Sequence, residues 1–121
     1  FPAGVLGIEV DAEAVAYATR HYGSPRVAFR QGDACRLDAL DDRSRDLVVS
    51  FETIEHVADD EAMLRGFARL LDDAGVLVTS TPNDWPVETS PYHVRSYDPV
   101  GFERALRGWF DDVTLFAHVV P

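Results

Sequence analysis

Residues 51–57 (FETIEHV) bring together the side chains best suited to acid–base or metal chemistry. Glu52, Glu55 and His56 stand at positions i, i+3 and i+4, so a helical turn here would project all three from one face. An imidazole exchanges its proton near neutral pH, and a neighbouring carboxylate can orient it. The simpler alternative is a solvated first turn of a helix, where acids favour the N-terminus.

Two more carboxylates follow short apolar segments. Glu9 closes the first apolar run (GVLGIEV), and Asp33 follows Gly32 after a second one (RVAFR). At a strand end, Glu9 could accept hydrogen bonds from both hydroxyls of a ribose, as in nicotinamide and adenosyl cofactors alike. Asp33 could accept the amino group of adenine, with the backbone N–H of Ala34 beside a ring nitrogen. Each acid alone fits a solvated strand end or a Gly–Asp turn equally well, so the interpretation depends on the pair.

The pattern of apolar residues predicts which elements position these groups. We expect strands over residues 4–10, 26–30, 46–51, 75–80 and 113–120, and helices beginning at Asp11, at Asp59 or Asp60, and at Asp98. Residues 46–51 (DLVVSF) lack alternation, as is typical of a strand covered on both faces. Strands that alternate with helices predict an α/β fold with a mainly parallel sheet, whose ligands bind at the carboxyl ends of the strands. Glu9, Asp33 and the FETIEHV turn should therefore meet at one rim.

Composition favours a folded, acidic domain. Of 121 residues, 46% are hydrophobic, and 21 acidic residues oppose 11 basic ones, all of them Arg, for a net charge of -10. This charge disfavours nucleic acid as a partner and suits a small molecule or a protein. No apolar run is long enough to predict a membrane span, and the single Cys35 is typical of a cytoplasmic protein. The start at Phe1 without a Met suggests a partial sequence.

Four stretches in this order, GIEVDAEAVAYA, VAFRQGDA, DLVVSFETIEHV and LLDDAGVLVTSTPN, resemble the class I S-adenosylmethionine-dependent methyltransferases. The likeness is to the broad group of small-molecule methyltransferases that includes the ubiquinone-biosynthesis O-methyltransferases, and it spans nearly the whole chain. It implies a Rossmann-like three-layer sandwich, with residues 1–121 as a partial methyltransferase domain. The expected reaction is in-line methyl transfer to a small-molecule acceptor, with a hydroxyl as the expected group.

The resemblance also assigns roles to residues. It implies that Glu9 binds the ribose, that Val10 packs on the adenine, and that Asp33 and Ala34 read the adenine edge. It places Ser50 and Phe51 beside the methionine part. Some relatives hold a divalent cation such as Mg with an E-x-x-E-H segment, which predicts a site made by Glu52, Glu55, His56 and His93.

For catalysis, we expect His56 to remove a proton from the acceptor hydroxyl, with Glu52 or Glu55 orienting it. Acceptor contacts are expected in residues 83–97, which carry Trp85, Tyr92 and Tyr97. The alternative for these aromatic residues is a surface loop that covers a helix.

The sequence also departs from the family pattern. The family's first strand and glycine-rich loop do not appear before GIEV, and the seventh strand is missing, so we expect a sheet without its central strand and an inactive fragment. Two other classes stay open. A nicotinamide-dependent oxidoreductase would share Glu9, but the GDA and ETIEHV segments speak against it. The second is a non-catalytic domain that keeps the fold for binding or assembly, and the absence of the glycine loop from the sequence keeps this class open.

Overall fold

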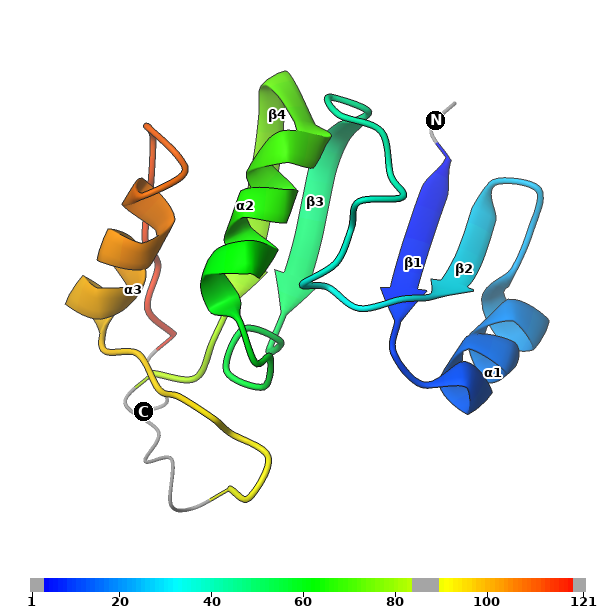
Figure 1. Cartoon of the computed structure of the whole chain (residues 1–121), viewed down its shortest axis with the longest axis horizontal. Coiled ribbons are helices and arrows are strands. Elements are labelled where there is room, and N and C mark those ends of the chain that lie inside the picture. The colour runs from blue at the N-terminus through cyan, green and yellow to red at the C-terminus, as the bar shows by residue number, and fades with distance from the viewer. Residues whose placement is uncertain (1–3, 84–89, 119–121) are drawn as a thin grey trace.

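The computed structural model describes residues 4–83 and 90–118 as an α/β fold of parallel strands and covering helices (Figure 1). The elements follow in the order β1 (Val5–Glu9), α1 (Ala12–Tyr22), β2 (Val27–Gln31), β3 (Arg45–Phe51), α2 (Asp60–Leu70), β4 (Leu71–Ser80) and α3 (Pro99–Arg107). The predicted alternation of strands and helices is therefore confirmed. No helix in the described ranges is long and apolar enough to cross a membrane.

The strands form two parallel pairs. β1 pairs with β2 from Val5↔Val27 to Glu9↔Gln31, and β3 pairs with β4 up to Phe51↔Ser80. Within the described ranges β1 and β3 are not hydrogen-bonded to each other, so the sheet is divided between them. Both strands nevertheless run in the same direction (Figure 1). The carboxyl ends of the strands therefore face the same side of the molecule.

Aspartate caps start all three helices. The side chains of Asp11, Asp59 and Asp98 accept the backbone N–H of Glu13, Ala62 and Gly101, at 2.9, 2.8 and 2.6 Å. A capping carboxylate satisfies an N–H that has no partner within the helix. The sequence left the start of α2 open between Asp59 and Asp60, and the structure shows that Asp59 is the cap.

The core lies between α2, α3 and the turn after β3. Its buried side chains share an apolar character and come from Leu37, Ile54, Met63, Leu64, Phe67, Leu70, Phe102 and Leu106. Val48 of β3 and Leu77 of β4 pack against this cluster from the sheet. The turn after β3, which contributes Ile54 to this cluster, is therefore held in place by the core.

The structure corrects the prediction that residues 46–51 form a strand covered on both faces. The face of β3 and β4 that points away from the core is exposed. Leu47, Val49 and Phe51 on β3 and Val76 and Val78 on β4 are between 43% and 59% exposed. The register pairs Leu47 with Val76 and Val49 with Val78, so these side chains share one face, which we call the β3–β4 outer face. The apolar run reflects a face that no helix of the described ranges covers.

The final predicted strand, residues 113–120, is also corrected. Residues 113–118 are irregular in the structure, and residues 119 and 120 lie outside the described residues. A strand needs a neighbour to accept and donate its ladder hydrogen bonds. No described strand pairs with residues 113–118, so β-forming side chains alone do not make them a strand.

Candidate cofactor and acceptor site

The rim predicted from the sequence exists as a cavity of about 510 Å³ at the carboxyl ends of β1 and β2. Glu9 and Val10 line it from β1, and Asp33 and Ala34 line it from the loop after β2. The turn after β3 contributes His56 to the same wall. The three segments therefore converge, as the sequence predicted.

Backbone contacts hold the two strand-end loops together. The N–H of Gly32 donates to the carbonyl of Glu9 at 2.9 Å, and Asp33 Oδ1 accepts the N–H of Cys35 at 2.8 Å. A Cβ at Gly32 would lie 3.0 Å from Cγ2 of Ile8, so the missing side chain permits this close approach. The φ of Gly32 is not positive, and the requirement for glycine here is one of space.

Val10 supplies an apolar surface at the cavity. It is 68% exposed although it is a large hydrophobic residue, and it lines the cavity beside Glu9. An exposed aliphatic side chain next to a carboxylate offers one surface for a flat ring and one group for hydroxyls.

Ser50 and Phe51 line a second cavity of about 320 Å³. Ile8, Ala34 and Thr53 line both cavities, so the two spaces are adjacent. Ser50 is buried, whereas Phe51 is 59% exposed. Residues of β1 and β3 line this second cavity, which is adjacent to the first, and a contact of Ser50 and Phe51 with the methionine part stays a prediction.

Glu55, His56 and His93 form a compact polar group. One ligand atom from each lies within 4.8 Å of the others, and the rings of His56 and His93 are 4.7 Å apart between centroids. Glu55 is 1% exposed; its Oε2 accepts from the Thr81 hydroxyl at 3.3 Å. Among the described residues its Oε1 has no hydrogen-bond partner, and it lies 3.7 Å from Nε2 of His56. A buried carboxylate oxygen without a partner is costly, and a nearby cation would relieve that cost.

The hydrogen-bond partner of Nδ1 decides which ring nitrogen of neutral His56 carries the proton. Nδ1 lies 2.9 Å from the carbonyl oxygen of Tyr92. A carbonyl can only accept, so Nδ1 carries the proton and Nε2 keeps its lone pair. The basic nitrogen lies 3.7 Å from Oε1 of Glu55, and His56 can take up a proton or bind a metal through Nε2.

Glu52 lies apart from this group. The segment expected to form a helical turn is a hydrogen-bonded turn, in which the N–H of His56 donates to the carbonyl of Thr53, and α2 begins only at Asp60. Glu52 has a φ of 49°, and its Oε1 accepts from the hydroxyl of Ser80 at 2.7 Å. A helical turn would place Glu52 beside Glu55 and His56. The left-handed backbone at Glu52 turns its side chain toward β4 instead.

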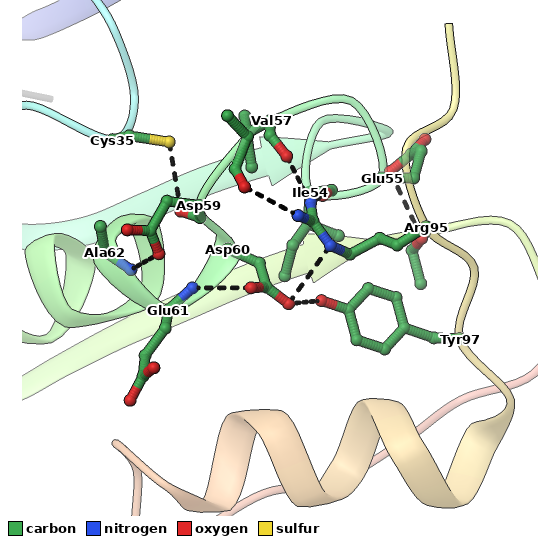
Figure 2. A network of polar contacts seen from close by, with 12 residues as sticks. Cys35, Ile54, Glu55, Val57, Asp59, Asp60, Glu61, Ala62, Arg95 and Tyr97 are labelled. Atoms are coloured by element: carbon green, nitrogen blue, oxygen red, sulfur yellow. Dashed lines mark hydrogen bonds and ion pairs between the residues drawn. The ribbon is translucent and has the colours of Figure 1, made fainter. Parts of the chain in front are cut away.

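Sequence reasoning missed Arg95, which forms a network with Asp60 and Tyr97 beside the site (Figure 2). Asp60 accepts from the hydroxyl of Tyr97 and pairs with the guanidinium of Arg95 at 3.5 Å. Burial, followed by the adjacent Asp60 carboxylate, raises the pKa of Tyr97 far above its ordinary value. Most partners of Arg95 are backbone carbonyls, which leave no signal in a sequence. Trp85, another expected contact, lies outside the described residues.

Residues 1–79 match the sequence model of a family described as a methyltransferase domain. The chain belongs to this family. A protein of Mycobacterium tuberculosis named "Probable S-adenosylmethionine-dependent methyltransferase" is 37% identical to this methyltransferase chain over 99 residues, 75% of this chain and 34% of that protein. A ubiquinone biosynthesis O-methyltransferase of Rhodopseudomonas palustris is 34% identical over 82 residues, 67% of this chain and 32% of that protein. The chain spans about a third of the length of these curated relatives.

Solved structures show the same fold as this methyltransferase chain. The complex between the Haloferax volcanii Trm112 methyltransferase activator and a methyltransferase matches with a TM-score of 0.78 at 23% identity, over 88% of this chain and 50% of that chain. The methyltransferase CalH, solved with S-adenosylhomocysteine, matches with a TM-score of 0.68 at 15% identity, over 88% of this chain and 35% of that one. The Rossmann-like fold class is therefore confirmed.

Proposed function

We propose that these 121 residues are part of one methyltransferase domain that transfers a methyl group from S-adenosylmethionine to a hydroxyl of a small molecule. The observation that carries the proposal is the cavity at the strand ends, where Glu9, Val10 and Asp33 meet the turn of His56. The family supports the cofactor, and the acceptor is inferred from the residues around His56. A cytoplasmic location stays a prediction.

The cavity fits an adenosyl group by its donor set. Glu9 would accept from the ribose hydroxyls, Val10 would pack against the adenine, and Asp33 and Ala34 would bind the adenine edge. When bound, S-adenosylmethionine supplies the methyl group. The chain's own side chains would align the acceptor with the methyl group, because an in-line displacement gains most from orientation.

Activation of the acceptor falls to His56. Its unprotonated Nε2 would take the proton from the acceptor hydroxyl, and the adjacent Glu55 carboxylate would stabilise the imidazolium that results. An orienting role for Glu52 stays a prediction, because its carboxylate lies on the side of Ser80.

The cofactor assignment is tested by calorimetry on the full-length protein with S-adenosylhomocysteine and with NAD. Glu9→Gln and Asp33→Asn should each weaken S-adenosylhomocysteine binding by about tenfold, since each loses a charge-assisted hydrogen bond. Glu13→Gln, an exposed carboxylate of α1, is the matched control and should bind as the unchanged protein does. Tighter binding of NAD than of S-adenosylhomocysteine would overturn the assignment.

The role of His56 is tested with radiolabelled S-adenosylmethionine and a panel of phenols and alcohols. His56→Ala should lower the methylation rate by about a hundredfold or more, while S-adenosylhomocysteine affinity changes little. His21→Ala on α1 is the control, and Glu52→Gln tests the orienting role. S-adenosylhomocysteine binding without methylation of any acceptor in the panel would favour the non-catalytic binding domain.

A divalent cation at Glu55, His56 and His93 is the second candidate function of this rim. The observation that favours it is the buried Glu55 Oε1, which has no partner among the described residues and lies close to an imidazole lone pair. One carboxylate and two imidazoles suit Mn²⁺ or a similar ion. Such an ion would lower the pKa of a bound hydroxyl.

The cation is tested by Mn²⁺ titration of the full-length protein, followed by electron paramagnetic resonance. We expect one site, which Glu55→Gln and His93→Gln weaken by tenfold or more and His21→Gln leaves unchanged. If millimolar Mn²⁺ finds no such site, the group holds no cation.

A further inference from the structure

Arg95 holds the turn after β3 through its guanidinium group (Figure 2). Its Nη1 donates to the carbonyls of Ile54, at 2.7 Å, and Val57, and its Nη2 donates to that of Ala58 at 3.1 Å. These carbonyls belong to residues that precede α2 and lie outside any strand or helix. The carbonyls of Ile54 and Val57 are partly shielded from water, and a shielded backbone carbonyl is costly when it is left without a partner.

The charge of Arg95 is balanced at the same place. Nε lies 3.5 Å from Oδ2 of Asp60, and the Arg95 side chain is only 21% exposed. Asp60 also accepts the hydroxyl of Tyr97, two residues after Arg95. The guanidinium therefore bridges three carbonyls and one carboxylate, and the planar fork of arginine suits this task better than the single ammonium of lysine.

This anchor joins the turn to the segment that carries Tyr92 and His93. Val94, next to Arg95, donates its N–H to the carbonyl of Glu55 at 2.8 Å. Two residues earlier, the carbonyl of Tyr92 accepts from Nδ1 of His56. The segment thus touches the turn at Glu55 and His56 themselves, and the charge-assisted hydrogen bonds of Arg95 hold it there.

We propose that Arg95 is the positioning residue that sets the tautomer of His56. By fixing residues 92–95 against the turn, it places the Tyr92 carbonyl where only an Nδ1–H can meet it. Nε2, which lies 3.7 Å from Oε1 of Glu55, is then left unprotonated. The assignment deepens the proposed function, because a base at Nε2 is what removes a proton from an acceptor.

The test is nuclear magnetic resonance of the four histidine side chains in the full-length protein, labelled with ¹⁵N and assigned with His56→Gln and His93→Gln. In the unchanged protein, neutral His56 should show a protonated Nδ1 and an unprotonated Nε2. In Arg95→Lys the shifts should move to those of a mixture of both tautomers, because lysine cannot bridge the same carbonyls. Arg107→Lys, which disturbs an exposed arginine paired with Glu103 on α3, should leave His56 unchanged.

Asp60→Asn gives a second measurement should Arg95→Lys fail to fold. It keeps an oxygen that accepts from Tyr97 and removes the charge that faces Arg95, so His56 should shift in the same direction by a smaller amount. An unshifted His56 in whichever of these variants folds would overturn the proposal. So would a His56 that carries its proton on Nε2 in the unchanged protein.

Kinetics separate this inference from the proposed function. Arg95→Lys should lower kcat by about tenfold and leave the KM for S-adenosylmethionine within about threefold, since the cofactor side chains are untouched. A changed tautomer with an unchanged kcat would refute the catalytic role of His56 and leave the positioning role of Arg95 intact. An unchanged tautomer with a lowered kcat would refute the positioning role alone.

Discussion

The side chain of Tyr97 joins the segment of residues 90–97 to α2. Its hydroxyl donates to Asp60, and Asp60 lies at the first turn of the helix. Burial and the Asp60 carboxylate raise the pKa of Tyr97, since both disfavour the phenolate. The phenol therefore stays protonated and keeps its hydrogen bond at any physiological pH.

Titration of Tyr97 has a measurable consequence at alkaline pH. Because the folded pKa is raised, this contribution to stability is present below pH about 10, where an unfolded tyrosine ionises, and is lost as the pH rises further. The chain contains no lysine, so few other groups titrate there. Absorbance at 295 nm should show one of the four tyrosines still protonated above pH about 11 in the folded protein. Tyr97→Phe should lack this late component; if it persists, another tyrosine is responsible.

Among single residues, the sequence located Glu9, Asp33 and His56 correctly at the cavity. The rule that ligands lie at the carboxyl ends of parallel strands needs only the strand positions, and those follow from apolar runs. Glu52 was predicted beside Glu55 and His56 because their spacing of i, i+3 and i+4 was interpreted as one face of a helical turn. The positive φ at Glu52 is set by its contacts with Ser80, which are distant in sequence.

At the scale of elements, the start of α2 fixes the position of the turn that carries His56. Asp59 caps the helix through the N–H of Ala62, and its carbonyl accepts from the thiol of Cys35. The next residue, Asp60, faces Arg95 and Tyr97 instead. The two adjacent aspartates therefore have different roles: Asp59 caps α2, and Asp60 binds the Arg95 and Tyr97 side chains beside the site.

The cap is tested by substitution. Asp59→Ala should lower the free energy of unfolding of the full-length protein by about 1 kcal/mol, because the N–H of Ala62 loses its partner at the helix N-terminus. The measurement is urea unfolding followed by circular dichroism. Asp112→Ala, at an exposed position after α3, should change the free energy of unfolding by less than about half of that. Equal effects would show that Asp59 does not act as a cap.

At the scale of the whole molecule, the sheet is divided between β1 and β3, and the β3–β4 outer face is uncovered in the described ranges. Unpaired strand edges and a contiguous apolar surface both favour association with other chains. We therefore expect the 121-residue polypeptide, expressed by itself, to be inactive and to bind the dye anilinonaphthalene sulfonate.

The outer face can be tested directly on that polypeptide. Val49→Thr together with Val78→Thr should reduce dye binding and self-association, because the two residues are register partners on the exposed face. Val100→Thr, an exposed valine on α3, is the control and should change neither. Fluorescence and light scattering report the two effects. A polypeptide that stays monomeric and binds no dye would show that this face is covered in solution.

The sequence by itself determined the order of elements from β1 to α3, the caps Asp11 and Asp98, and the rim where Glu9, Asp33 and His56 meet. These features depend on neighbours within a few residues and on one topological rule, so local patterns suffice. It also carried the four stretches that resemble the methyltransferases.

Only the tertiary structure decided how the rim is held and which faces are covered. Three of the four partners of Arg95 are backbone carbonyls some 40 positions earlier in the chain, and every residue has a backbone carbonyl, so no side-chain pattern marks them. The same holds for residues 113–118, whose side chains suit a strand but whose conformation depends on a neighbouring strand to pair with.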